Sequence, residues 1–148
     1  MGVFHPDLVG ILVRVLQRLG STRALTVFGR EGLDEISISG QTLVGELKDG
    51  RVSEYEIHPE QFNLPVHDPK VLQVAKVEES KIMLLGALEN KLGAARDIVA
   101  LNAGASIYVC GLAETLADGV EQAFEMIASG AARQKLDTFV SLTRKLTV

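Results

Sequence analysis

One segment in the second half of the chain, AARDIVALNAGASIYVCG (residues 94–111), is apolar on nearly every side of the helix that it predicts. A helix of that kind has no face that favours water, so other elements must bury it. A chain of 148 residues is long enough to supply those elements within one ordinary domain that has a real core. The sequence therefore predicts a layered domain built around this central helix.

The residues before the central helix predict strands and one further helix. Residues 2–4 are typical of the end of a short strand, residues 5–20 predict a helix with one apolar face, and residues 23–29 predict a buried strand. The order strand, helix, strand favours a right-handed crossover and a parallel pair. Residues 35–40 alternate as in a strand, and residues 42–57 predict a hairpin around an Asp-Gly turn.

The last seventy residues predict helices. Besides the central helix, we expect one helix over residues 77–93, another beginning after Thr115, where Asp118 completes a capping box, and a last one over residues 131–146. One face of the last helix gathers Ala132, Leu136, Phe139, Val140 and Thr143. The expected fold class is α/β: a partial, open, mixed and mainly parallel sheet flanked by helices, with a β-hairpin and a helical C-terminal segment.

Composition narrows the class of function. The formal net charge of −4 disfavours nucleic-acid binding, because phosphate-binding domains usually carry a basic surface. No segment has the length and apolarity of a membrane span, and no signal-peptide pattern follows Met1, so we expect a cytoplasmic protein. Cys110 lies in an apolar run and is expected to be a buried structural thiol. The histidines His5, His58 and His67 lack the spacing of zinc ligands.

Two adjacent carboxylates, Asp34 and Glu35, follow the strand predicted over residues 23–29. A solvated turn is one explanation, since turns favour Asp. A cation site is the other, because ligands of open α/β sheets bind at the carboxyl ends of strands and Mg²⁺ takes one or two carboxylates there. Asn102, in the middle of the central helix, is expected to bond to neighbouring backbone rather than to a substrate, since buried polar groups need partners.

The sequence resembles the anthranilate phosphoribosyltransferase family over essentially its whole length. The resemblance is carried, in order along the chain, by GVFHPDLV, GLDEIS, EYEIHPEQF, DIVALNAGASIYVCG and GVEQAFEMIASGAARQKL. It implies transfer of phosphoribosyl from phosphoribosyl pyrophosphate to anthranilate in tryptophan synthesis, with Mg²⁺ as the cofactor. It assigns Asp34 and Glu35 to the binding of that Mg²⁺.

The resemblance extends only to the C-terminal part of the family's α/β domain, to which residues 1–148 are expected to correspond. The glycine-rich phosphate loop, the Lys-His-Gly-Asn-Arg segment, the arginine that contacts anthranilate and the small helical domain have no counterpart, and no G-x-G occurs here. We therefore expect no catalytic residue in this chain, negligible activity from it alone, and no family-type homodimer. The alternatives are a nucleic-acid-binding relative of the same fold and a fragment like a pyrimidine nucleoside phosphorylase.

Overall fold

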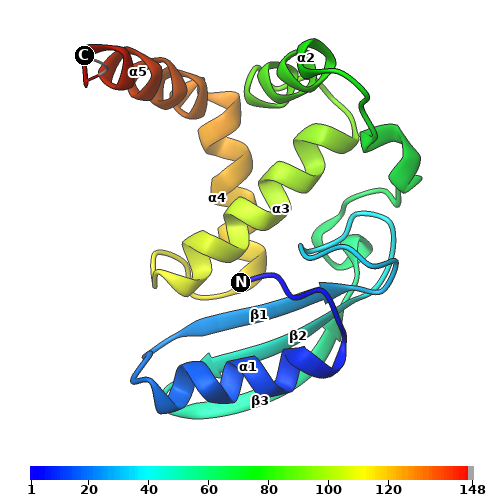
Figure 1. Ribbon diagram of the computed structural model, residues 1–148, viewed down its shortest axis with the longest axis vertical. Helices are drawn as coiled ribbons and strands as arrows, with labels where there is room; N and C mark the ends of the chain where they lie inside the picture. The colour runs from blue at the N-terminus through cyan, green and yellow to red at the C-terminus, as the bar shows by residue number, and fades with distance from the viewer. Residues whose placement is uncertain (147–148) are drawn as a thin grey trace.

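A computed structural model describes residues 1–146 as a three-stranded sheet with a helix on one face and a helical layer on the other (Figure 1). The elements are α1 (Asp7–Arg18), β1 (Ala24–Gly29), β2 (Thr42–Lys48), β3 (Arg51–Ile57), the short 3₁₀ helices η1 (Pro59–Phe62) and η2 (Pro69–Leu72), α2 (Val77–Leu88), α3 (Ala94–Val109), α4 (Leu116–Ala128) and α5 (Ala131–Leu146).

The sheet is antiparallel throughout, in the order β1-β2-β3. The predicted hairpin is confirmed: β2 and β3 are joined by Asp49 and Gly50, whose φ values of 51° and 72° match the two-residue turn typical of Asp-Gly hairpins. Successive residues of β1 point to opposite faces. Leu25 and Val27 face the helical layer, whereas Phe28 packs against α1.

The prediction of a mainly parallel sheet is wrong for the described strands. Parallel pairing is limited to an isolated bridge between Gly2 and Val27, in which Val27 donates to the Met1 carbonyl and Val3 donates to the Val27 carbonyl, both at 3.0 Å. The predicted crossover through α1 therefore exists, but the segment that pairs with β1 in parallel is the isolated bridge at Gly2 and not a full strand. Every longer pairing comes from β1, β2 and β3, which meander.

Residues 35–40 do not form the predicted strand, although Ile36 and Ile38 are buried in the main core. Their backbone groups bond to side chains and to a loop instead of to a neighbouring strand, and the Ile38 carbonyl accepts from the His67 amide at 2.9 Å. The Ser37 amide donates to Thr42 Oγ1 at 2.9 Å, and the Ser39 amide donates to Ser37 Oγ at 2.9 Å. Ser37 is as buried as its two neighbours, so the alternating sequence pattern corresponds here neither to alternating burial nor to a ladder.

The central helix α3 packs against the sheet on one side and against α4 on another (Figure 1). Leu101, Ala105 and Tyr108 join the main core with β1, β2 and β3, which confirms that this helix organises the domain. Burial is not complete around it, because Val99 is 38% exposed. Cys110 follows the last helical residue and is exposed, so the prediction of a buried thiol is wrong.

Two glycines let α3 and α4 approach closely. A Cβ on Gly104 would lie 2.5 Å from the Val120 backbone, and one on Gly119 would lie 2.4 Å from the Gly104 carbonyl oxygen. The α4 helix begins with the predicted capping box, in which Thr115 and Asp118 exchange side-chain and backbone hydrogen bonds. These contacts fix α4 along α3, and α4 then leads directly into α5.

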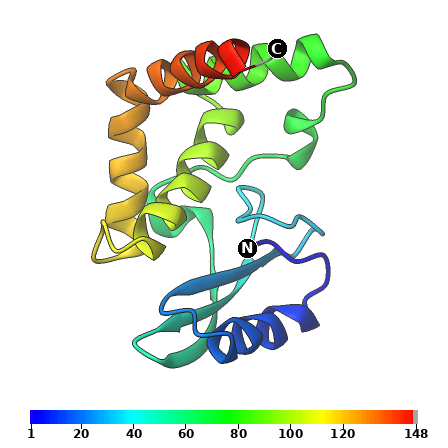
Figure 2. The ribbon, with the colours of Figure 1, turned by 60° about the vertical axis from the view of Figure 1, so that its left-hand side comes forward.

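Helices α2 and α5 lie side by side at the end of the molecule remote from the sheet (Figure 2). Arg133 of α5 pairs there with Glu89, which caps α2. The predicted last helix is confirmed in its bounds, but none of its described residues is buried: Phe139 is 61% and Leu146 is 71% exposed. An apolar groove of about 720 Å³ lies beside α2, lined by Val71, Ile82 and Met83 among others.

Candidate metal centre

Asp34 and Glu35 lie in a tight turn directly after β1. The turn, defined here as the acidic turn (residues 32–36), begins where the Gly32 amide donates to the Gly29 carbonyl at 2.9 Å. The chain then returns to β1, since the Gly29 amide donates to the Leu33 carbonyl at 2.8 Å. Gly32 has a φ of 100°, which few other residues adopt. Both acidic residues follow this return and are exposed.

The acidic turn is held from the α3 side by Asn102. Asn102 Oδ1 accepts from the Ile36 amide at 2.9 Å, and Nδ2 donates to the Ile36 carbonyl at 2.9 Å. Nδ2 also donates to the Ile98 carbonyl one helical turn earlier, at 3.0 Å. The prediction that this amide bonds to neighbouring backbone is confirmed, and the backbone that it binds is that of the residue next to Glu35.

The acidic turn forms one edge of a depression of about 640 Å³, which we call the α3 groove. The turn contributes Asp34, Glu35 and Ile36, and α3 contributes both apolar and polar side chains. The remaining lining residues are Met1, Gly2, Val27, Ile98, Val99, Asn102, Ala105, Ser106, Val109 and Cys110. The groove therefore pairs two exposed carboxylates with a largely apolar floor.

The chemistry of the donors fits Mg²⁺ better than a softer metal. Asp34 and Glu35 offer carboxylate oxygens, and Ser106 adds a hydroxyl to the same groove. Within residues 1–146, no group of three or more His, Cys, Asp or Glu side chains is arranged to hold a metal ion. Mg²⁺ does not need such a group, because it keeps several waters and completes its shell with substrate phosphates. Asp34 and Glu35 are therefore candidate ligands for such an ion.

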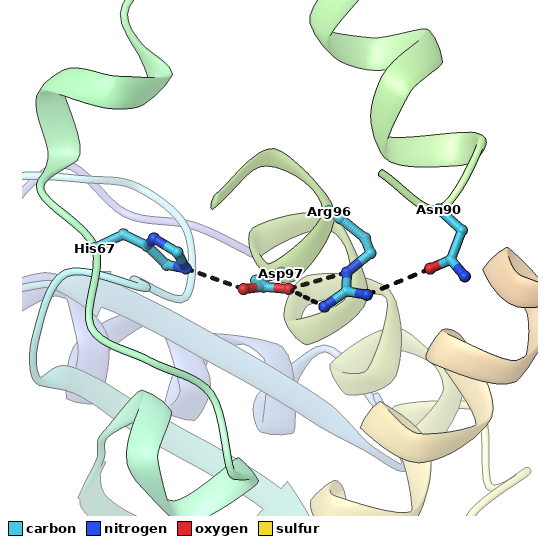
Figure 3. A network of polar contacts seen from close by, with 4 residues as sticks. All are labelled: His67, Asn90, Arg96 and Asp97. Atoms are coloured by element: carbon cyan, nitrogen blue, oxygen red, sulfur yellow. Dashed lines mark hydrogen bonds and ion pairs between the residues drawn. The ribbon is translucent and has the colours of Figure 1, made fainter. Parts of the chain in front are cut away.

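A second polar cluster, which the sequence patterns did not reveal, lies at the start of α3 (Figure 3). Asp97 is only 2% exposed; its Oδ2 lies 2.9 Å from His67 Nε2, and its Oδ1 accepts from Arg96 at 2.9 and 3.1 Å. Arg96 also reaches Asn90 Oδ1 at 3.4 Å and covers the Phe124 ring. The cluster connects the loop around His67 to α3 and α4. Adjacent Arg96 and Asp97 at the start of a largely apolar helix are the one sequence signal for it, and they do not indicate the partner His67.

A third cluster joins the sheet to the other end of α3. Glu46 of β2 accepts from Tyr55 of β3 at 3.0 Å and from the Tyr108 hydroxyl. Burial, followed by the charge and hydrogen bond of Glu46, raises the pKa of Tyr55 well above its usual range. Lys48 Nζ lies 3.2 Å from the Tyr108 hydroxyl. None of these residues lines the α3 groove, so the cluster supports the fold rather than the candidate site.

Comparison with known proteins assigns the chain to a family. A model of the glycosyl transferase family, a/b domain, matches residues 1–133. The anthranilate phosphoribosyltransferase of Burkholderia ambifaria is 57% identical over 145 residues, which make up 98% of this chain and 42% of that protein. The chain thus spans less than half the length of this relative.

Solved structures agree on the fold. The anthranilate phosphoribosyltransferase from Thermus thermophilus superposes with a TM-score of 0.87 at 33% identity, over 97% of this chain and 42% of that one. The Saccharomyces cerevisiae enzyme in complex with PRPP and Mg has a TM-score of 0.81 at 22% identity, over 95% of this chain and 41% of that one, a likeness of fold alone. Among residues 1–146, no helix combines the length and apolarity needed to cross a bilayer. Because the family model covers 133 of the 148 residues, this chain belongs to the glycosyl transferase family through its a/b domain.

Proposed function

We propose that this chain is a segment of an anthranilate phosphoribosyltransferase, which transfers phosphoribosyl from phosphoribosyl pyrophosphate to anthranilate. The observation that carries the proposal is the acidic turn: Asp34 and Glu35 are exposed at the rim of the α3 groove, on a backbone that hydrogen bonds hold in place. Relatives that bear this name are 57% identical to the chain, and the yeast protein of the same fold is known in complex with PRPP and Mg.

In this proposal Asp34 and Glu35 hold a Mg²⁺ ion. When bound there, the ion would neutralise charge on the pyrophosphate group of the substrate. The two carboxylates would hold the ion at the edge of the groove, whose floor is lined largely by apolar residues of α3. No described residue supplies an amide-rich loop for the phosphates, because the sequence contains no G-x-G.

The remaining parts of the catalytic site are proposed to lie in the portion of the relatives that this chain does not match. The chain spans 42% of the Burkholderia protein, and residues 1–148 are proposed to correspond to the C-terminal portion of its α/β domain. Phosphoribosyl transfer depends on positioning and on charge stabilisation. A metal-binding turn supplies only part of both, so the chain alone is expected to have negligible activity. A cytoplasmic location and a homodimer of the complete enzyme are further expectations from the family.

An anthranilate fluorescence assay tests the proposal. Consumption of anthranilate with phosphoribosyl pyrophosphate and Mg²⁺ is followed for the chain alone and for the chain mixed with the complementary portion of the Burkholderia relative. We expect activity only in the mixture. The double variant Asp34→Asn, Glu35→Gln should lower that activity at least tenfold and raise the Mg²⁺ concentration required. Glu121→Gln, at an exposed acid of α4 outside the groove, serves as the matched control and should change neither quantity.

Activity of the chain without a partner would contradict the assignment of catalysis to the unmatched portion. Activity of the mixture with an unchanged Mg²⁺ requirement in the double variant would remove Asp34 and Glu35 from the metal site. Absence of activity in both preparations would leave the family in place and favour a binding role for the chain.

A further inference from the structure

We propose that Asn102 is a positioning residue for the metal site: its side chain fixes the backbone that carries Asp34 and Glu35. This inference rests on the proposed function, because it assigns a role toward the same ion. Asn102 touches neither carboxylate. It binds both polar backbone groups of Ile36, accepting from the amide at 2.9 Å and donating to the carbonyl at 2.9 Å.

The geometry of this contact restricts the turn more than a single hydrogen bond could. Two bonds from one planar amide to one residue fix both the distance and the orientation of that residue. The third bond, from Nδ2 to the Ile98 carbonyl, holds the amide plane relative to α3. Ile36 itself is buried in the main core, so the turn is held at its end by both packing and hydrogen bonds.

The opposite side of the acidic turn is also restricted. Gly2 lies so close to Asp34 that a Cβ on Gly2 would fall 1.5 Å from the Asp34 carbonyl oxygen. The Leu33 carbonyl is bonded to Gly29 of β1. The backbone of Asp34 and Glu35 is therefore held between the N-terminal bridge on one side and Asn102 on the other, while both side chains stay exposed.

The choice of residue at position 102 supports a positioning role. Asn is an unfavourable residue in a helix interior, because its short amide competes for backbone groups. In α3 it lies among apolar neighbours, and its bonds to Ile36 span 66 residues of sequence. Partners outside the first ligand shell typically change metal affinity by about 10- to 100-fold when they are removed. We expect about a tenfold loss for Asn102, because it acts through the backbone.

The test measures metal binding to the chain itself. Free Mn²⁺ is measured by electron paramagnetic resonance in the presence of inorganic pyrophosphate, for the unchanged chain and for Asn102→Leu, which keeps the branching of the side chain and removes all three bonds. We expect the dissociation constant for Mn²⁺ to rise about tenfold. Gln122→Leu removes a side-chain amide of α4 that lies outside the groove and donates to the Leu112 carbonyl at 3.3 Å, and it should leave the constant unchanged. Asn102→Ala serves as the second variant if Asn102→Leu does not fold.

Thermal unfolding of each variant separates positioning from simple support of the fold. If Asn102→Leu and Asn102→Ala lower the melting temperature while the folded protein binds Mn²⁺ with unchanged affinity, the inference is wrong and the proposed metal site stands. The double variant Asp34→Asn, Glu35→Gln distinguishes the other failure. If it binds Mn²⁺ as tightly as the unchanged chain, or if the unchanged chain binds none, the metal assignment fails and the role of Asn102 fails with it.

Discussion

At the scale of single residues, Asp97 stands out as the one charged residue that is buried among residues 1–146. Its carboxylate is almost fully buried and accepts from Arg96, while His67 contacts its other oxygen (Figure 3). Removing one member of such a cluster leaves partly buried polar groups without a partner. We expect Asp97→Ala to lower the free energy of unfolding by about 2–4 kcal/mol, as measured by urea denaturation.

Asp137→Ala is the matched control for that variant. Asp137 also pairs with an arginine on a helix, at 3.3 Å from Arg133 Nε, but its side chain is 62% exposed. An exposed pair gains little in water. The control should therefore unfold at the same urea concentration as the unchanged chain. If Asp97→Ala and Asp137→Ala lowered the free energy of unfolding equally, burial of Asp97 would not be the reason for its contribution to stability.

Tyr55 gives a prediction for alkaline pH. Burial and Glu46 raise its pKa in the folded chain above its ordinary value of 10. The unfolded chain therefore loses this proton first as the pH rises, so the stabilisation is complete below about pH 10 and declines above it. Urea midpoints between pH 8 and pH 11 should fall less steeply for Tyr55→Phe than for the unchanged chain. If the urea midpoints of both proteins fell equally steeply, Tyr55 would not contribute to the loss of stability at high pH.

Individual residues were predictable from the sequence to different extents. The backbone role of Asn102 followed from its position, because a buried amide in an apolar helix needs partners nearby. The metal role of Asp34 and Glu35 stays a prediction. Cys110 was expected to be buried because its neighbours are apolar, but α3 ends one residue earlier and turns the thiol outward. The contact between His67 and Asp97 spans 30 residues, and no local pattern indicates such a pairing.

At the scale of elements, the crossing of α3 and α4 depends on the absence of side chains at Gly104 and Gly119. A methyl group at Gly104 would collide with the backbone of Val120, which cannot move without shifting α4. We expect Gly104→Ala to destabilise the chain by about 1–3 kcal/mol, the usual cost of overpacking. Chemical denaturation measures the loss.

Gly86→Ala in α2 is the control for Gly104→Ala. There a new methyl group would meet only the flexible side chain of Lys91, at 3.2 Å. Alanine favours a helix interior over glycine, so this variant should be as stable as the unchanged chain or more stable by about 0.5–1 kcal/mol. If both substitutions destabilise equally, glycine is required for a reason other than the close approach of the two helices.

Elements that are determined by residues close together in the sequence were predicted well. The Asp-Gly turn between β2 and β3 and the capping box of α4 depend on residues that are neighbours in sequence, and both are confirmed. The antiparallel pairing of β1 with β2 depends on which distant strand is available, and the order of elements did not indicate it. Residues 35–40 failed as a strand because side chains of Thr42 and Asn102 satisfy their backbone groups.

At the scale of the whole molecule, the helical end formed by α2 and α5 exposes an apolar surface. Phe139, Leu142 and Leu146 follow one another along the same side of α5 and are all exposed. Surfaces of this kind promote association. We expect the chain to self-associate with rising concentration in sedimentation velocity, and Phe139→Ser with Leu142→Ser to shift it toward the monomer without a change in melting temperature.

Phe4→Ser with Leu112→Ser is the control at this scale. Phe4 and Leu112 are exposed apolar residues as well, but one precedes α1 and the other follows α3, away from α5. Isolated exposed apolar residues are common and have little effect. A chain that remains associated after the α5 substitutions, but dissociates after these, would place the contact outside the helical end.

The exposed thiol at the end of α3 has a practical consequence for the whole molecule. Cys110 is the single cysteine in the sequence, and it lines the same groove as Asp34 and Glu35. A maleimide fluorophore would therefore attach at one known position without any engineered change. A change in its emission would report a polypeptide or a nucleotide entering that groove, so the rate of such binding could be measured by stopped flow.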